Sequence, residues 1–256
     1  MKIHVKSHLI QNGLYTGPAL RAPLGSIEVD PDLGTIFISD SIDCRDSLIA
    51  GQGTNLIVLG HVKSGRAIIV EGDLEARGEI GAGDKLIAND LVCLGGSVSG
   101  RAGIHANSMH VGGSILSENG DVIASQSIRC EGSVYALGDI RCGGDLIRAG
   151  QDIVSVTGSI ESFGRLIALE GKIEAEVDIA AAETILSGTS IRTSGRIKAG
   201  LRILAGKVGS KIPEPNECYV DAVEVHAESI EAMSVQDQLT LPELSIDEDQ
   251  DRGLRQ

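Results

Sequence analysis

The sequence predicts an all-β fold, a single-stranded triangular β-helix (solenoid) of about ten coils with about 18 residues in each coil. Three observations predict it. Aliphatic residues recur about every six positions, a small residue usually stands two positions after each, and Gly, Asp or Ser usually follows near the end of the unit. Each unit then holds one short strand and one corner, and three units close a coil.

The aliphatic period defines the strands that line the interior. Its most regular members are Val62, Ile68, Leu74, Ile80, Leu86, Val92, Val98 and Ile104, each six residues after the last. Less regularly it extends back to Ile27 and forward to Ile203. Because side chains alternate along a strand, the aliphatic residue and the small residue after it both point inward. Aliphatic doublets such as Ile68-Ile69 and Leu86-Ile87 recur one coil apart, which favours the three-unit repeat.

Composition agrees with a thin β interior. Hydrophobic residues make up 42% of the chain and charged residues 23%, which argues against disorder. There are 33 glycines, only 2% aromatic residues and no tryptophan, so the interior is built from Ile, Leu, Val and Ala. Ten coils about 4.8 Å apart give a rod of roughly 50 Å. The aliphatic residue is rarely followed directly by Gly, which favours a right-handed helix over a left-handed hexapeptide helix.

The period breaks at both ends, and these breaks define the expected domains. Residues 1–25 form an N-terminal cap or lead-in strand, 26–208 the solenoid, 209–241 an irregular final coil or C-terminal cap, and 242–256 an acidic flexible tail. The ends are therefore expected to be capped. Residues 209–256 contain 12 acidic and 3 basic side chains, so most of the net charge of −14 lies there.

The N-terminus has no continuous apolar region of a signal peptide, and no apolar stretch is long enough to span a membrane. We therefore expect a cytoplasmic protein with reduced thiols.

Two cysteines in "IRCEGSVYALGDIRCGGDLIRAG" raise the question of a metal or redox site. Cys130 and Cys142 both occupy the small inward position that Ala fills elsewhere, and Cys44 fits the same position. No Cys-x-x-Cys spacing occurs, so we interpret them as small buried hydrophobes. By strict count Arg148 would point inward, and we predict a local register shift that turns Ile147 inward instead.

No catalytic residue, cofactor site or metal site is predicted. His105 and His110 stand at outward positions, and the glycine-rich stretches follow the corner period rather than a phosphate-binding motif. The coil length is uniform up to residue 209, so no long loop forms a cleft. An acyltransferase or a polysaccharide-active β-helix is the disfavoured enzymatic alternative, and we expect no small-molecule substrate.

Outward aliphatic residues predict a protein-contact stripe. The second member of each doublet points away from the interior, and a stripe of such residues on a flat sheet indicates packing against something. The candidates are Ile69, Ile87, Ile123, Ile167, Leu186 and Leu204. By the three-unit count, the first three share one face and the last three another.

The stretches "GDLEARGEIGAGDKLIANDLVCLGGSVSGRAG" and "GSIESFGRLIALEGKIEAEVDI" resemble the bactofilins, polymer-forming bacterial cytoskeletal proteins. The resemblance covers about residues 45–208 and lies in the style of the repeat. It implies a right-handed triangular β-helix, nucleotide-independent self-assembly end to end and a scaffolding role. The solenoid here is longer than a bactofilin core, and its ends are expected to be structured.

The leading hypothesis is a non-enzymatic scaffold, a homo-oligomer that self-assembles or docks a protein partner along a flat face. One alternative is an acidic binding protein that mimics nucleic acid and blocks a nucleic-acid-binding partner. Another is a structural β-helix of a phage. Direct binding of nucleic acid is not expected.

Overall fold

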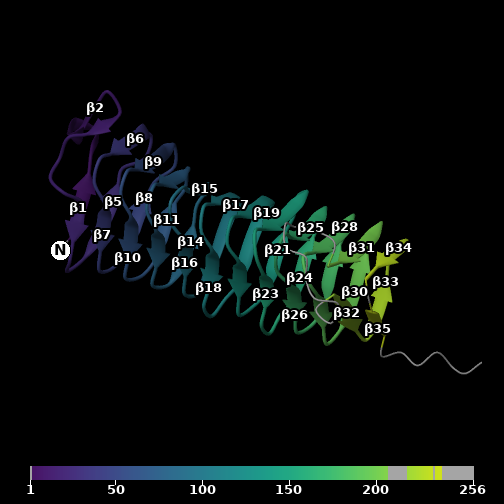
Figure 1. Cartoon of the computed structure of the whole chain (residues 1–256). Helices are drawn as coiled ribbons and strands as arrows, with labels where there is room; N and C mark the ends of the chain where they lie inside the picture. Colours follow the sequence, from purple (N-terminus) through teal and green to yellow (C-terminus); the bar gives the residue numbers. More distant parts are fainter. Residues whose placement is uncertain (1, 207–217, 233, 238–256) are drawn as a thin grey trace, which may run out of the picture.

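The computed structural model describes residues 2–206, 218–232 and 234–237, which form one elongated β-solenoid (Figure 1). These residues contain no α-helix; parallel strands stack in about 10 turns that recur about 19 residues apart. The predicted all-β solenoid is confirmed. The repeat exceeds the predicted 18 residues because several corners take one or two extra residues. The hand of the helix stays a prediction.

Three flat faces run along the rod, and each coil contributes one strand to each face. The first face contains β1 (Lys2–Val5), β5 (Ser26–Val29), β8 (Leu48–Ala50), β11 (Ile68–Val70), β14 (Lys85–Ile87), β21 (Ile140–Cys142), β24 (Ile160–Ser162), β27 (Ile179–Ala181), β30 (Arg196–Ala199) and β33 (Glu224–His226). The second face contains β6 (Gly34–Ile38), β9 (Thr54–Val58), β12 (Leu74–Ala76), β15 (Asp90–Cys93), β22 (Leu146–Ala149), β25 (Arg165–Ala168), β28 (Thr184–Ser187), β31 (Arg202–Ala205) and β34 (Ser229–Glu231).

The third face is a separate sheet of 12 strands. It contains β4 (Arg21–Ala22), β7 (Ile42–Cys44), β10 (Val62–Ser64), β13 (Ile80–Ala82), β16 (Val98–Gly100), β18 (Ile115–Ser117), β20 (Val134–Ala136), β23 (Ile153–Ser155), β26 (Ile173–Ala175), β29 (Ile191–Thr193), β32 (Tyr219–Ala222) and β35 (Ser234–Asp237). β17 (Gly103–Val111) and β19 (Val122–Cys130) run around the corner between the first and second faces and join them into one sheet.

The core is a set of aliphatic columns that run the length of the rod. On the first face one column reads Ile3, Ile27, Leu48, Ile68, Leu86, Ile104, Val122, Ile140, Ile160, Ile179, Ile197 and Val225. The members from Ile27 to Ile197 are fully buried. Each coil thus stacks its aliphatic side chains on those of the next, and no coil buries its apolar face alone.

Polar side chains hold the corners together by bonding the backbone of the following coil. At the corner between the second and third faces, the Ser97 hydroxyl accepts the N–H of Ser114, the Ser114 hydroxyl that of Ser133, and the Ser133 hydroxyl that of Asp152. The Asp152 carboxylate then accepts the N–H of Lys172. These bonds satisfy N–H groups that corners would otherwise leave without partners.

The predicted register shift near Arg148 is confirmed. Ile147 is fully buried and pairs with inward Leu166, whereas Arg148 is half-buried and pairs with outward Ile167. The inward position predicted for Val92 is wrong. Leu91 is fully buried and pairs with inward Leu74, because the step from Leu86 to the next inward residue is five residues and not six.

At the N-terminal end, β1 pairs in parallel with β5 and so forms part of the first coil. A short 3-10 helix (Ser7–Leu9) and an antiparallel hairpin of β2 (Ile10–Gln11) and β3 (Leu14–Tyr15) follow. Asn12 and Gly13 form the hairpin turn with φ of 51° and 77°, the positive values that Asn-Gly turns adopt readily.

At the C-terminal end, β32 to β35 continue the parallel pairing. The proposed irregular coil at 209–241 lies partly outside the described residues, and the proposed acidic tail at 242–256 lies wholly outside them.

Candidate interaction surface

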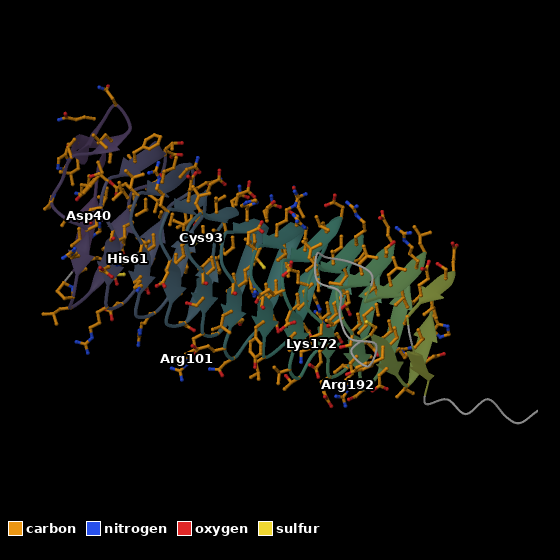
Figure 2. The ribbon with its side chains drawn as sticks, viewed as in Figure 1. Asp40, His61, Cys93, Arg101, Lys172 and Arg192 are labelled. Atoms are coloured by element: carbon orange, nitrogen blue, oxygen red, sulfur yellow. The ribbon has the colours of Figure 1, made fainter. Side chains whose placement is uncertain are left out.

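Side chains project outward from the strands along the whole rod (Figure 2), and those at the middle of the strands form an outward column on each face. The column on the first face, here called the first-face column, has one residue per coil. It reads His4, Glu28, Ile49, Ile69, Ile87, His105, Ile123, Arg141 and Glu161, and continues beyond.

The structure places the six predicted contact residues on two faces, as the three-unit count predicts. Ile69, Ile87 and Ile123 belong to the first-face column, with His105 between the last two. Ile167, Leu186 and Leu204 lie on three consecutive strands of the second face. All six are half-buried by flanking side chains. Their role in contacts stays a proposal.

Further outward apolar residues extend these patches. Ile49 is 38% exposed and lies beside Ile69, so the apolar part of the first-face column begins one coil earlier. The doublet Leu48-Ile49 carries the same sequence signal as the predicted members. On the third face, Leu116 pairs with Tyr135, which pairs with Val154. Leu116 and Val154 are the second members of the doublets Ile115-Leu116 and Ile153-Val154, whereas no doublet marks Tyr135, so only the pairing places Tyr135 in this patch.

Charged residues flank the apolar part of the first-face column on both sides. Beyond Ile123, the Arg141 guanidinium lies 2.6 Å from Asp139 and 3.5 Å from Glu161. Beyond Ile49, the carboxylate of Glu28 pairs with Lys2 and lies 3.7 Å from His4. The first face therefore has an apolar centre between two mixed-charge ends.

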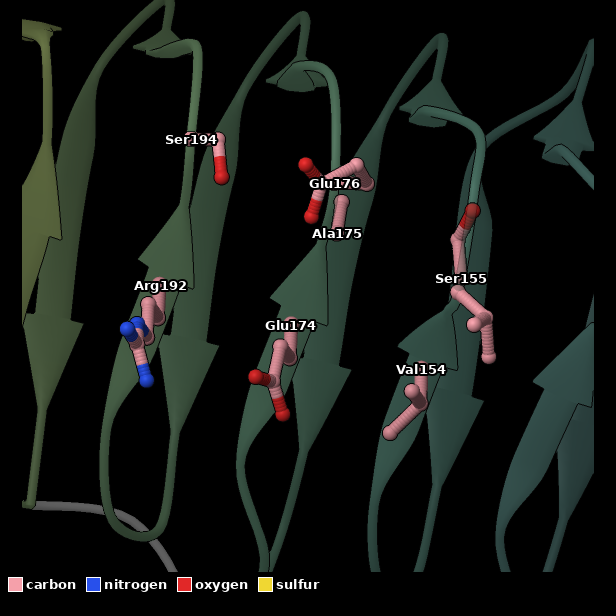
Figure 3. Close-up of a pocket in the computed structure, with 8 residues that line it drawn as sticks. Val154, Ser155, Glu174, Ala175, Glu176, Arg192 and Ser194 are labelled. Atoms are coloured by element: carbon pink, nitrogen blue, oxygen red, sulfur yellow. The ribbon is translucent and has the colours of Figure 1, made fainter.

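A shallow depression of about 340 Å³ lies on the third face. Figure 3 shows Val154, Glu174 and Arg192 pointing outward from three neighbouring strands, with Ser155, Ala175, Glu176 and Ser194 toward the corner. Arg192 also reaches Asp221 on the next strand, at 3.6 Å. The depression is open to solvent and lined mostly by outward side chains, although Ser155 and Ala175 are themselves buried, so it suits a protein side chain better than an enclosed small molecule.

The sequence did not predict one group of side chains that resembles a Ser-His-Asp catalytic triad. His61 Nδ1 lies 3.1 Å from the Ser41 hydroxyl and Nε2 lies 3.1 Å from the Asp43 carboxylate. Ser41 is only 9% exposed, and its hydroxyl also accepts the His61 backbone N–H, as serines do at this corner in later coils. Because the Ser41 hydroxyl is buried and already bonded to the backbone of the next coil, we interpret the group as part of the corner ladder.

None of the five cysteines is in a disulfide, and all five are buried. Cys93 and Cys142 donate from Sγ to the corner carbonyls of Gly78 and Gln126. Burial raises the pKa of Cys142, and it raises the pKa of Cys130 to about 12, so these thiols stay protonated and poorly nucleophilic. In the part of the chain that the structure describes, no group of three or more His, Cys, Asp or Glu residues could hold a metal ion.

No helix within the described ranges is long and apolar enough to cross a membrane. Comparisons of the chain with protein-family models, curated proteins and solved structures gave no match.

Proposed function

We propose that this chain is a non-enzymatic structural protein, a scaffold that stacks end to end into filaments in the manner of the bactofilins and presents its flat faces to protein partners. The solenoid fold is consistent with such a role. The observation that carries the proposal is the opposite charge of the two ends of the rod.

The first 25 residues contain Lys2, Lys6 and Arg21 and no acidic residue, whereas residues 218–237 contain five acidic residues and no Lys or Arg. Unlike charges at the two ends favour head-to-tail contacts and oppose head-to-head or tail-to-tail contacts. A heterologous contact of this kind does not close on itself and so generates a filament.

The sequence predicts capped ends, and the β2–β3 hairpin does pair along β6 at the N-terminal end of the second face. The first-face strands of the terminal coils nevertheless keep an edge that is suited to such stacking. Among the described strands, β1 pairs only with β5, and β33 only with β30, so each has one edge available in this part of the chain. In the register of the first face, Lys2 of the first coil and Glu224 of the last coil occupy equivalent positions, and so do Ile3 and Val225. A copy added at the end would therefore set Lys2 beside Glu224 and extend the aliphatic column through two partly buried residues.

Light scattering and negative-stain electron microscopy test the proposal. We expect filaments whose length grows with protein concentration and falls with salt, because exposed charges are screened. Lys2→Glu and Arg21→Glu should each shorten the filaments, whereas Arg101→Glu, at an exposed corner in the middle of the rod, should not. Adding Glu224→Lys to Lys2→Glu should restore them. A parent protein that stays monomeric at all concentrations would refute the proposal.

The acidic-mimic alternative draws less support from the described residues. Asp121, Asp139 and Asp178, which lie along one corner, each accept a backbone N–H from the following coil at 2.7–2.8 Å. These carboxylates serve coil stacking, which accounts for them without a nucleic-acid-binding partner.

A further inference from the structure

We infer that two copies of this chain pair side by side and antiparallel through their first faces, around a two-fold axis that passes beside Ile87. This lateral contact is separate from the end-to-end stacking proposed above. It rests on the first-face column, whose sequence of apolar and charged residues is complementary to itself when reversed.

The apolar centre supplies the first part of the match. Ile87 is the midpoint of the stretch from Ile49 to Ile123, with two coils on either side. A two-fold axis along the strand direction at Ile87 sets this residue against itself. It sets Ile69 against His105 of the second copy, and Ile49 against Ile123. The contact thus covers the half-exposed isoleucines of both copies together.

The charged ends supply the second part, which does not depend on the first. At the same alignment, Glu28 lies opposite Arg141 of the second copy, three coils from the axis on each side. One coil farther out, Glu161 lies opposite His4, beside Lys2 on the same strand. Each negative charge meets a positive or protonatable group, which is the arrangement that an isologous interface requires.

Other alignments lose this match. In a parallel pair, Glu28, Arg141 and Glu161 would each lie opposite the same residue of the second copy, and like charges in contact are repulsive. Moving the axis by half a coil sets Glu28 against Ile123 or Arg141 against Ile49, which buries a charge against an aliphatic side chain. The antiparallel alignment at Ile87 matches both the apolar and the charged residues.

The area of the contact follows from the geometry of the rod. From His4 to Glu161 there are eight coil steps of about 4.8 Å, so the contact is about 40 Å long, and a three-residue strand with its corners is about 10–15 Å wide. Two copies would bury about 800–1,200 Å² in total, which is below the range for stable specific interfaces and typical of weak, transient ones. We therefore expect a weak dimer that forms at high local concentration, as between neighbouring filaments.

Site-directed cross-linking tests the alignment. All five native cysteines are buried, so a thiol introduced on the outer surface reacts selectively. Because packed sheets lie about 10 Å apart, the cross-linker is a short bis-maleimide and not a disulfide. Each variant is made in the full-length chain that also carries Arg21→Glu. Because Arg21→Glu is expected to weaken end-to-end stacking, a dimer detected in this background reports the lateral contact alone.

Ile87→Cys should cross-link to itself, and a mixture of Ile49→Cys with Ile123→Cys should cross-link although neither does so alone. Ile57→Cys, a half-buried outward position on the second face, is the matched control and should give no dimer. Self-cross-linking of Ile49→Cys would indicate a parallel pair and overturn the inference, as would the absence of any cross-link.

Analytical ultracentrifugation gives a second measurement. Ile87→Glu should weaken the dimer about a hundredfold or more, because it sets two carboxylates together at the axis. The variant should fold, since Glu161 occupies the equivalent outward position farther along the same face. Ile57→Glu should leave the dimer unchanged, and equal effects of the two substitutions would contradict the inference.

Discussion

Replacement of Ile147 by Ala tests the register on which every outward assignment in this part of the rod depends. Ile147 is fully buried against Leu166, and Arg148 is half-buried on the outer surface. Ile147→Ala removes three carbon atoms, worth about 2.4 kcal/mol at about 0.8 kcal/mol each. The unfilled space adds up to about 2 kcal/mol at about 24 cal/mol per Å³. We expect a loss of 2–4 kcal/mol in the free energy of unfolding (an order-of-magnitude figure).

The matched control is Arg148→Ala, which removes a side chain from the surface and should cost about 0.5 kcal/mol or less. Urea unfolding followed by far-UV circular dichroism measures both, since the chain has no tryptophan for fluorescence. With a slope of about 3 kcal/mol per molar urea, Ile147→Ala should lower the midpoint by about 1 M. A larger loss for Arg148→Ala than for Ile147→Ala would refute the register and the outward assignments next to it.

Three further predictions concern single residues. Cys130 should react with a thiol reagent only after unfolding. Its folded pKa of about 12 exceeds the unfolded value of 9.0, so its contribution to stability is full below about pH 9 and is lost as the pH rises toward 12. The variant Cys130→Ala should therefore show a smaller fall in the free energy of unfolding between about pH 9 and 12. A Cβ at Gly195 would lie 1.8 Å from the Val177 carbonyl oxygen, so Gly195→Ala should cost about 2 kcal/mol or more, whereas Gly81→Ala, whose nearest contact is 3.3 Å, should be close to neutral in the same urea assay. Ser41 should be labelled by a fluorophosphonate no faster than the Ser41→Ala background by mass spectrometry, because its hydroxyl is buried and hydrogen-bonded; faster labelling would indicate a nucleophile.

The inward columns could be predicted from the sequence because burial in a narrow interior admits few residue types. The inward residue cannot be predicted from the period where two neighbouring residues are both aliphatic. Leu91 and Val92 suit the interior equally well, so the six-residue step chose the wrong one. At Leu146 and Ile147 the same ambiguity is resolved by Arg148. If Leu146 took the regular inward position, Arg148, two residues later, would also point inward, and burying its charge would be costly.

The candidate surface could be predicted only in part. Doublets reveal an outward aliphatic residue beside an inward one, and they identified six positions on the correct faces. Tyr135 has no such marker. Ser41 and His61 are 20 positions apart and meet at a corner of the rod. Ser and Asp are common at corners because they favour turns, so their presence there does not indicate a particular contact. The hydrogen-bond partner of a corner side chain depends on the number of residues in each corner, and the six-residue period does not specify that number.

The number of residues between β31 and β32 shows that strand stacking does not fix the length of chain between two faces of this rod. β28 and β29 are separated by three residues at this corner, whereas β31 and β32 are separated by 13, yet Ile191 still pairs with Val220 in the regular register. Corner length is therefore uncoupled from strand stacking at this site. A change in the number of residues between β31 and β32 should therefore leave the pairing of Ile191 with Val220, and the coils on either side, undisturbed.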